Sequence, residues 1–203
     1  TRVLALLDTY DKQTPVLVDV TRELGRPGLE AAVTPLCVLL GHKEETVRAH
    51  AAVSLEYIGS KESVKSLTAR ARREKDPATA NHLYRAPGRC GAYDAKVRKA
   101  LIKAIKGADS EFASYGPIIG LAYFEGDEKA MRGVEKALKK VGPPGGGRRG
   151  WGRNNIKRAF LCWTLAQIGD AKSGAFIREE MMPSLEHMQG RWAGPIRDFY
   201  DAV

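Results

Sequence analysis

Lysine and arginine recur at helical spacing along three segments of this sequence, and this pattern has the clearest chemical meaning. The segments 62–75, 93–107 and 128–140 carry five Lys or Arg each, against two, one and two acidic residues. Their spacing of i, i+3, i+7 and i+10 places the basic residues of each segment on one face of an α-helix. The resulting basic stripes are Lys65, Arg72 and Lys75; Lys96, Lys99, Lys103 and Lys106; and Lys129, Arg132, Lys136 and Lys139. Such rows of cations attract and hold anionic partners.

The same stripes have a second interpretation, because every amphipathic surface helix needs a polar face toward solvent. The net positive charge is concentrated in these three segments, which fits either interpretation. The chain has 203 residues and a net charge of +9, and the three segments account for all of that excess. Like charges stacked side by side oppose folding, so they are a costly way to build an ordinary surface.

A Gly- and Arg-rich stretch at 142–153 adds further candidates for binding. It contains Arg148, Arg149, Trp151 and Arg153, which can stack on bases or pack on a protein surface. A spacer without a binding role is the alternative. The stretch is not a phosphate-binding loop, because the GxxxxGK[ST] pattern is absent.

Residues for catalysis or metal binding are sparse. The four histidines and three cysteines form no HExxH or CxxC pattern, and no GxSxG elbow occurs. We therefore expect no enzyme activity, no metal site and no cofactor.

The cysteines fit a reducing compartment slightly better than an oxidising one, but no targeting signal indicates a location. Because the first residue is Thr, we expect the sequence to be part of a longer chain or complex.

A glycine that recurs along the sequence predicts the helices that carry the basic stripes. Gly28, Gly59, Gly91, Gly126 and Gly169 are spaced by 31, 32, 35 and 43 residues, with apolar residues at offsets that return to one helix face. This pattern predicts a helix, a tight turn at glycine, and a second helix, repeated five times. First helices are predicted at 14–25, 45–58, 78–90, 111–125 and 154–168. Second helices are predicted at 29–40, 62–75, 93–107, 128–141 and 171–182.

Two stretches carry a resemblance to a known family. VRAHAAVSLEYIGSKESVKSL at 47–67 and IKRAFLCWTLAQIGDAKSGAFI at 156–177 each have a basic residue opening the first helix (Arg48, Arg158), an Ala/Leu-rich stripe, and Ile-Gly before a small or acidic turn. They resemble HEAT-like repeats, the short variety found in phycobilisome-lyase-type proteins. The resemblance implies an all-α solenoid in one domain, 1–203. Its parts are units at 14–41, 45–76, 78–107, 111–141 and 154–182, the insertion 142–153 and a C-terminal cap at 183–203.

The resemblance also suggests what the stripes do. In HEAT-like solenoids the second helices line the concave surface, so the stripes would form a positive groove about three repeats wide. We therefore expect a non-catalytic scaffold that holds an acidic protein segment in this groove. The main alternative is a nucleic-acid binder that contacts phosphates. A third is a lyase or chaperone for a tetrapyrrole, which the lysine-rich face argues against.

Overall fold

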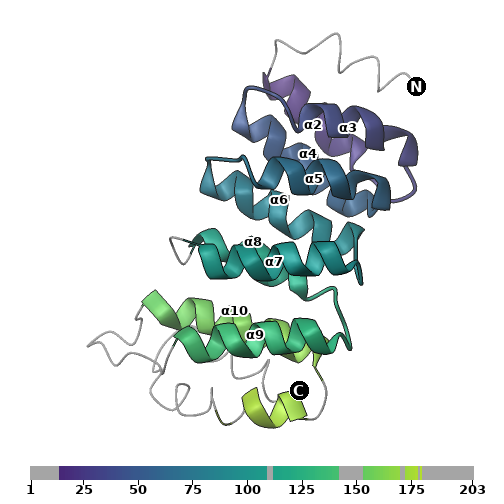
Figure 1. Ribbon diagram of the computed structural model, residues 1–203. Helices are drawn as coiled ribbons and strands as arrows, with labels where there is room; N and C mark the ends of the chain where they lie inside the picture. Colours follow the sequence, from purple (N-terminus) through teal and green to yellow (C-terminus); the bar gives the residue numbers. More distant parts are fainter. Residues whose placement is uncertain (1–13, 109–111, 142–152, 170–171, 178, 180–203) are drawn as a thin grey trace, which may run out of the picture.

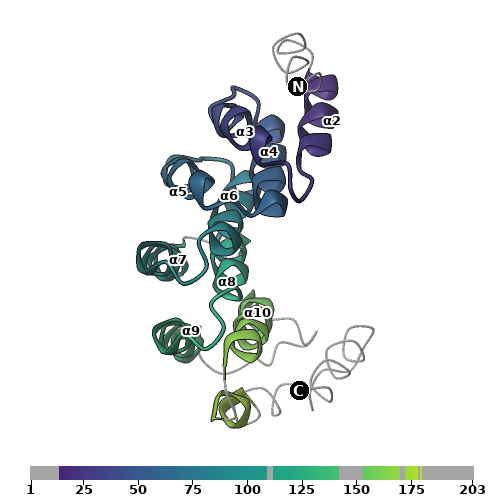
Figure 2. The same cartoon turned by 90° about the vertical axis from the view of Figure 1, so that its right-hand side faces the viewer.

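The chain folds into stacked pairs of helices, as the computed structural model shows (Figure 1). The structure describes residues 14–108, 112–141, 153–169, 172–177 and 179. None of these residues forms a β-strand, and the helices alternate between two columns (Figure 2). The expected all-α solenoid architecture is therefore confirmed. The C-terminal cap predicted at 183–203 and nearly all of the insertion 142–153 lie outside the described residues.

The first column agrees closely with the predicted first helices. It consists of α2 (Thr14–Leu24), α4 (Glu45–Ile58), α6 (Pro77–Cys90), α8 (Tyr115–Leu121) and α10 (Arg153–Ile168). Helix α8 differs most from its prediction, because it is preceded by a 3-10 turn, η3 (Phe112–Ser114), and ends at Leu121. Pro117 lies in its first turn, where the missing N–H of proline breaks no intrahelical hydrogen bond.

The second column contains the helices that carry the basic stripes. It consists of α3 (Val33–Leu39), α5 (Val64–Ala71), α7 (Ala95–Gly107) and α9 (Glu128–Val141). Helices α3 and α5 are shorter than predicted, because their first turns are the 3-10 segments η1 (Glu30–Ala32) and η2 (Lys61–Ser63). Residues 172–177 are helical, at the place where a fifth second helix is expected.

The turns between paired helices use two different solutions. Gly59 closes α4 in the left-handed conformation with φ 76°, as the glycine column predicts. In the third unit Gly91 has φ −123°, and Tyr93 takes the left-handed conformation instead, with φ 68°. The left-handed residue of this turn therefore lies two positions after the glycine.

Substituting Gly59 tests the turn directly. Gly59→Ala is expected to lower the free energy of unfolding by about 1–2 kcal/mol, because a Cβ atom disfavours the left-handed region. Asparagine tolerates this region better, so Gly59→Asn should cost clearly less than Gly59→Ala. Urea denaturation of both variants measures the difference. Equal losses for Ala and Asn would show that the φ angle is not the cause.

The apolar core runs through the stack in two connected clusters. One extends from Leu17 to Cys90 and the other from Val97 to Ile177, and Val64 and Tyr84 pack against both. The first helices are also joined by hydrogen bonds. Ser54 Oγ donates to the Thr21 carbonyl oxygen at 2.7 Å, and Thr164 Oγ1 donates to the Ile118 carbonyl oxygen at 3.1 Å.

The stack is bent, and glycines in the first column explain the direction of the bend. A Cβ atom built on Gly88 of α6 would lie 2.1 Å from the carbonyl oxygen of Gly120 in α8. A Cβ atom on Gly116 would lie 2.1 Å from the carbonyl oxygen of Asn81. Backbones therefore touch in the first column, whereas the second helices meet through side chains such as Ile102. This makes the first column the shorter, inner side of the bend, and α5, α7 and α9 lie on the outer side (Figure 2).

Candidate functional site

The basic stripes lie on solvent-exposed faces of the second helices. Every stripe lysine and arginine on α7 and α9 is exposed, and so are Lys65, Arg72 and Lys75 at α5. The opposite faces of α7 and α9 are buried through residues such as Val97, Leu101 and Val134. The helical spacing in the sequence therefore predicted which face of each helix is exposed, and the binding role of these cations stays a prediction.

The stripes of α7 and α9 lie side by side. A Cβ atom built on Gly133 of α9 would lie 2.7 Å from Cδ1 of Ile102 in α7, so the two helices are in close contact. The two helices are neighbours in the stack (Figure 1), so exposed lysines that are about 33 residues apart in the sequence share one surface.

The curvature of this surface differs from the expectation. The resemblance implied that the second helices line the concave side, but they lie on the outer side of the bend (Figure 2). The reason is the backbone contact between α6 and α8, which draws the first helices together. The basic surface is therefore convex as a whole, and its concave features are clefts between neighbouring second helices.

The first cleft lies between the C-terminal ends of α5 and α7, above the first turns of α6. It has a volume of about 770 Å³. Its cations are Arg72, Lys75 and Lys103, and its apolar lining includes Tyr84 and several alanines. We call it the α5–α7 cleft.

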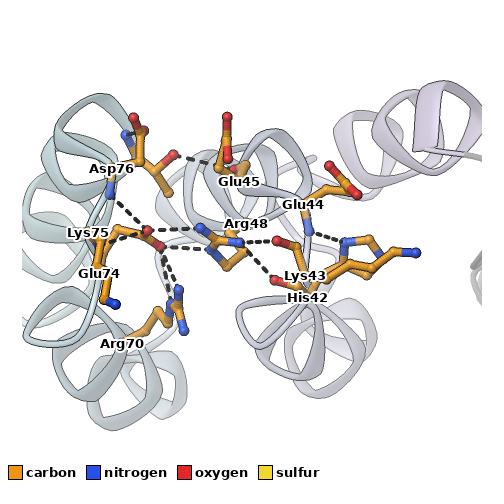
Figure 3. A network of polar contacts seen from close by, with 10 residues as sticks. His42, Lys43, Glu44, Glu45, Arg48, Arg70, Glu74, Lys75 and Asp76 are labelled. Atoms are coloured by element: carbon orange, nitrogen blue, oxygen red, sulfur yellow. Dashed lines mark hydrogen bonds and ion pairs between the residues drawn. The ribbon is translucent and has the colours of Figure 1, made fainter.

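Among the described residues that line the α5–α7 cleft, Glu74 has the one acidic side chain, and it is already paired (Figure 3). Its oxygens accept hydrogen bonds from Arg48 Nε at 2.7 Å and from an Arg48 terminal nitrogen at 2.8 Å. Arg70 donates a further bond at 2.8 Å, and the backbone N–H groups of Lys75 and Asp76 donate at 3.0 and 3.2 Å. The Glu74 side chain is only 1% exposed.

This network keeps the Glu74 side chain ionised and connects α4, α5 and the start of α6. Burial by itself would raise the pKa of Glu74, but the hydrogen bonds from Arg48, Arg70 and the backbone outweigh it and lower the pKa from 4.5 to about 2. Arg48 also donates to the carbonyl oxygens of His42 and Lys43 at 2.9 and 2.7 Å, just after α3. The basic residue that opens the first helix in the sequence motif is thus a buried structural group, and Arg158 of α10 is likewise buried.

The second cleft lies between the C-terminal ends of α7 and α9, next to α10. It has a volume of about 600 Å³ and is called the α7–α9 cleft. Four lysines line it: Lys106, Lys136, Lys140 and Lys157. Its apolar lining comes from Ile105, Ala108, Ala137 and Val141, and no acidic residue is among its described lining.

The clefts contain only part of the predicted site. Of the predicted binding residues, Arg72, Lys103, Lys106 and Lys136 line a cleft. Lys65, Lys96, Lys99 and Lys129 are exposed on the same helices but line neither cleft. Arg132 pairs with Glu128 at 3.0 Å, and the Lys139 ammonium lies 5.6 Å from the ring centre of Phe176. Arg148, Arg149 and Trp151 lie outside the described residues, and Arg153 begins α10.

Sequence reasoning missed two cations that line the α7–α9 cleft. Lys140 directly follows the stripe residue Lys139, but it breaks the spacing that defined the stripe. Lys157 belongs to a first helix, which the stripe pattern did not cover. Only the relative positions of the helix ends bring these residues to the same cleft.

Other sites are poorly supported in the part of the chain that the structure describes. There, no three His, Cys, Asp or Glu side chains lie together in a way that would hold a metal ion. Burial raises the pKa of Cys90 and lowers the pKa of His82, which is the behaviour of packed side chains rather than of activated ones. The described helices also include none with the length and apolar character needed to cross a membrane.

Paired helices stacked in two columns, with a cationic outer face, define this chain as an α-solenoid repeat protein. Residues 2–86 match the model of the HEAT repeat family, which confirms the resemblance to HEAT-like repeats over this part of the chain. The match concerns HEAT repeats in general, so the likeness to the phycobilisome-lyase variety stays a prediction. HEAT repeats generally serve as scaffolds for protein interactions. A comparison with curated proteins gave no match.

Proposed function

We propose that this protein is a non-catalytic scaffold that holds an acidic segment of a partner protein against the outer face of α5, α7 and α9. The supporting observation is the pair of adjacent clefts whose rims are basic and whose one described carboxylate, Glu74, is neutralised by two arginines. Clefts lined by one sign of charge concentrate the electrostatic potential and attract partners of the opposite charge.

Two features favour an acidic protein segment over nucleic acid. A DNA duplex is stiff, so a convex surface meets few of its phosphates, whereas a flexible peptide can follow the surface into the clefts. The clefts also have apolar lining, from residues such as Tyr84 and Ile105, which can bury an apolar side chain of a peptide but offers nothing to a phosphate group.

Charge reversal on the two longest stripes tests this function. We expect the variant with Lys99, Lys103, Arg132 and Lys136 all changed to Glu to bind fluorescein-labelled poly-L-glutamate at least about 30-fold more weakly. Exposed ion pairs contribute about 0.5 kcal/mol each, and reversal replaces each attraction with a repulsion of similar size. The four side chains are exposed, so the variant should retain its fold. Fluorescence anisotropy measures the affinities.

A matched control makes the same change of charge away from these helices. It carries the substitutions Arg22→Glu, Arg26→Glu, Lys43→Glu and Arg89→Glu, all at exposed positions. This control should bind poly-L-glutamate within a few-fold of the unmodified protein. Equal weakening in both variants would contradict a located site. Tight binding to a random-sequence DNA duplex, together with weak binding to poly-L-glutamate, would instead favour the nucleic-acid alternative.

A further inference from the structure

We propose that the two clefts together recognise an extended acidic segment that carries two apolar side chains three residues apart, one for each cleft. This inference rests on the proposed function and specifies the chemistry of the partner. It follows from three properties of the clefts: their charge, their lining and their spacing.

Each cleft combines a basic rim with an apolar floor. In the α5–α7 cleft, Ala100, Ala104 and Tyr84 are less exposed than the cations Arg72 and Lys103. In the α7–α9 cleft, Ile105, Ala137 and Val141 are less exposed than the lysines of α7 and α9. A bare anion would gain nothing from such a floor. An apolar side chain flanked by carboxylates satisfies both parts, because burial of its surface adds to the charge attraction.

The two clefts are neighbours on either side of α7. Ala108, which follows α7, lines both of them. Lys103 contributes to one rim and Lys106, three residues later on the same helix, to the other. A single bound segment that crosses the exposed side of α7, where Lys103 and Lys106 lie, can therefore enter both clefts.

The spacing of the clefts selects the conformation of the segment. Packed helices have axes about 8–10 Å apart, so clefts on opposite sides of one helix are separated by a similar distance. A polyproline II chain rises about 3.1 Å per residue with three residues per turn, so side chains at i and i+3 point the same way about 9 Å apart. A β-strand matches less well, because its same-side residues are about 7 or 13 Å apart.

Three labelled peptides of equal charge test the inference on the unmodified protein. The first contains Leu-Glu-Glu-Leu between flanking aspartates, the second has the same composition with adjacent leucines, and the third has serines in place of both leucines. We expect the first peptide to bind about 10-fold more tightly than either of the others, because only it places one leucine in each cleft. Fluorescence anisotropy at constant salt measures the ratio.

Ala108→Leu narrows both clefts without any change of charge, and Ala95→Leu is its control at the exposed, opposite end of α7. The 10-fold preference should disappear in Ala108→Leu and persist in Ala95→Leu, while both variants keep their affinity for poly-L-glutamate. A preference that survives Ala108→Leu would overturn the assignment to the clefts.

The peptide comparison keeps the two levels of the proposal distinct. Equal binding of all three peptides by the unmodified protein would overturn the cleft inference and leave the proposed scaffold function intact. No binding of any acidic peptide or of poly-L-glutamate would overturn both. This comparison needs no variant, so it decides the question even if Ala108→Leu does not fold.

Discussion

Replacing Glu74 by alanine is expected to lower the free energy of unfolding by about 3–5 kcal/mol, a large part of the stability of a protein this size. The substitution leaves the buried Arg48 side chain, which is 9% exposed, without its ionic partner. It also removes the acceptor for Arg70 and for two backbone N–H groups that begin the turn into α6. Chemical denaturation followed by circular dichroism measures the loss.

The exposed pair Arg132–Glu128 provides the matched control, because both of its side chains are more than two-thirds exposed. Glu128→Ala should change the free energy of unfolding by about 0.5 kcal/mol or less. If Glu74→Ala were as mild as Glu128→Ala, the network in Figure 3 would not hold the repeats together.

The same network should make stability depend on pH in acid. The pKa of Glu74 lies at about 2 in the folded protein and at about 4.5 without its partners, so the unfolded chain binds the proton more readily. Its contribution is complete above pH 4.5 and is lost as the pH falls toward 2. The difference between these two pKa values corresponds to about 3 kcal/mol in the free energy of unfolding. Glu74→Gln, which cannot ionise, should show a correspondingly flatter profile over this range.

The second large effect is expected at Gly88. Gly88→Ala should lower the free energy of unfolding by about 3 kcal/mol or more, because the new Cβ atom would lie 2.1 Å from the Gly120 carbonyl oxygen and only a backbone shift can relieve the clash. The shift would separate α6 from α8. Thermal and chemical denaturation measure the loss.

Gly107→Ala is the control for this substitution. Gly107 is the last residue of α7, and a Cβ atom there meets nothing within 4 Å. Alanine should therefore be neutral or stabilise the protein by up to about 1 kcal/mol, because it restricts the unfolded chain. Similar losses at Gly88 and Gly107 would mean that the contact between α6 and α8 is looser than the structure has it.

The helices could be predicted from the sequence because their signals are local. The glycine column, the apolar spacing and the turn residues placed α4 and α10 within one residue of their observed bounds. The same spacing identified Lys103 and Lys136 as exposed. Gly91 and α8 are two of the places where the prediction differed, and there neighbouring residues imposed another local solution, namely the left-handed Tyr93 and the proline in a first turn.

The shape of the site could not be predicted in this way. The direction of the bend depends on how closely Gly88 and Gly120 approach, and these residues are distant in the sequence. The clefts depend on where helix ends meet, which is why Lys157 joined the site unforeseen and Lys99 lies outside both clefts. A pattern read along one helix indicates which face is charged, and the distance between repeats decides how that face is curved.

The contact of backbones on the inner side has a mechanical consequence. The glycines of α6 and α8 leave those helices no room to approach further, so the spacing on the inner side can hardly be shortened. Outer helices that meet through side chains can change their separation more easily. Flexing of the array therefore alters the width of the α5–α7 and α7–α9 clefts far more than the spacing along the inner side, and a ligand seated in those clefts would set the curvature of the whole array.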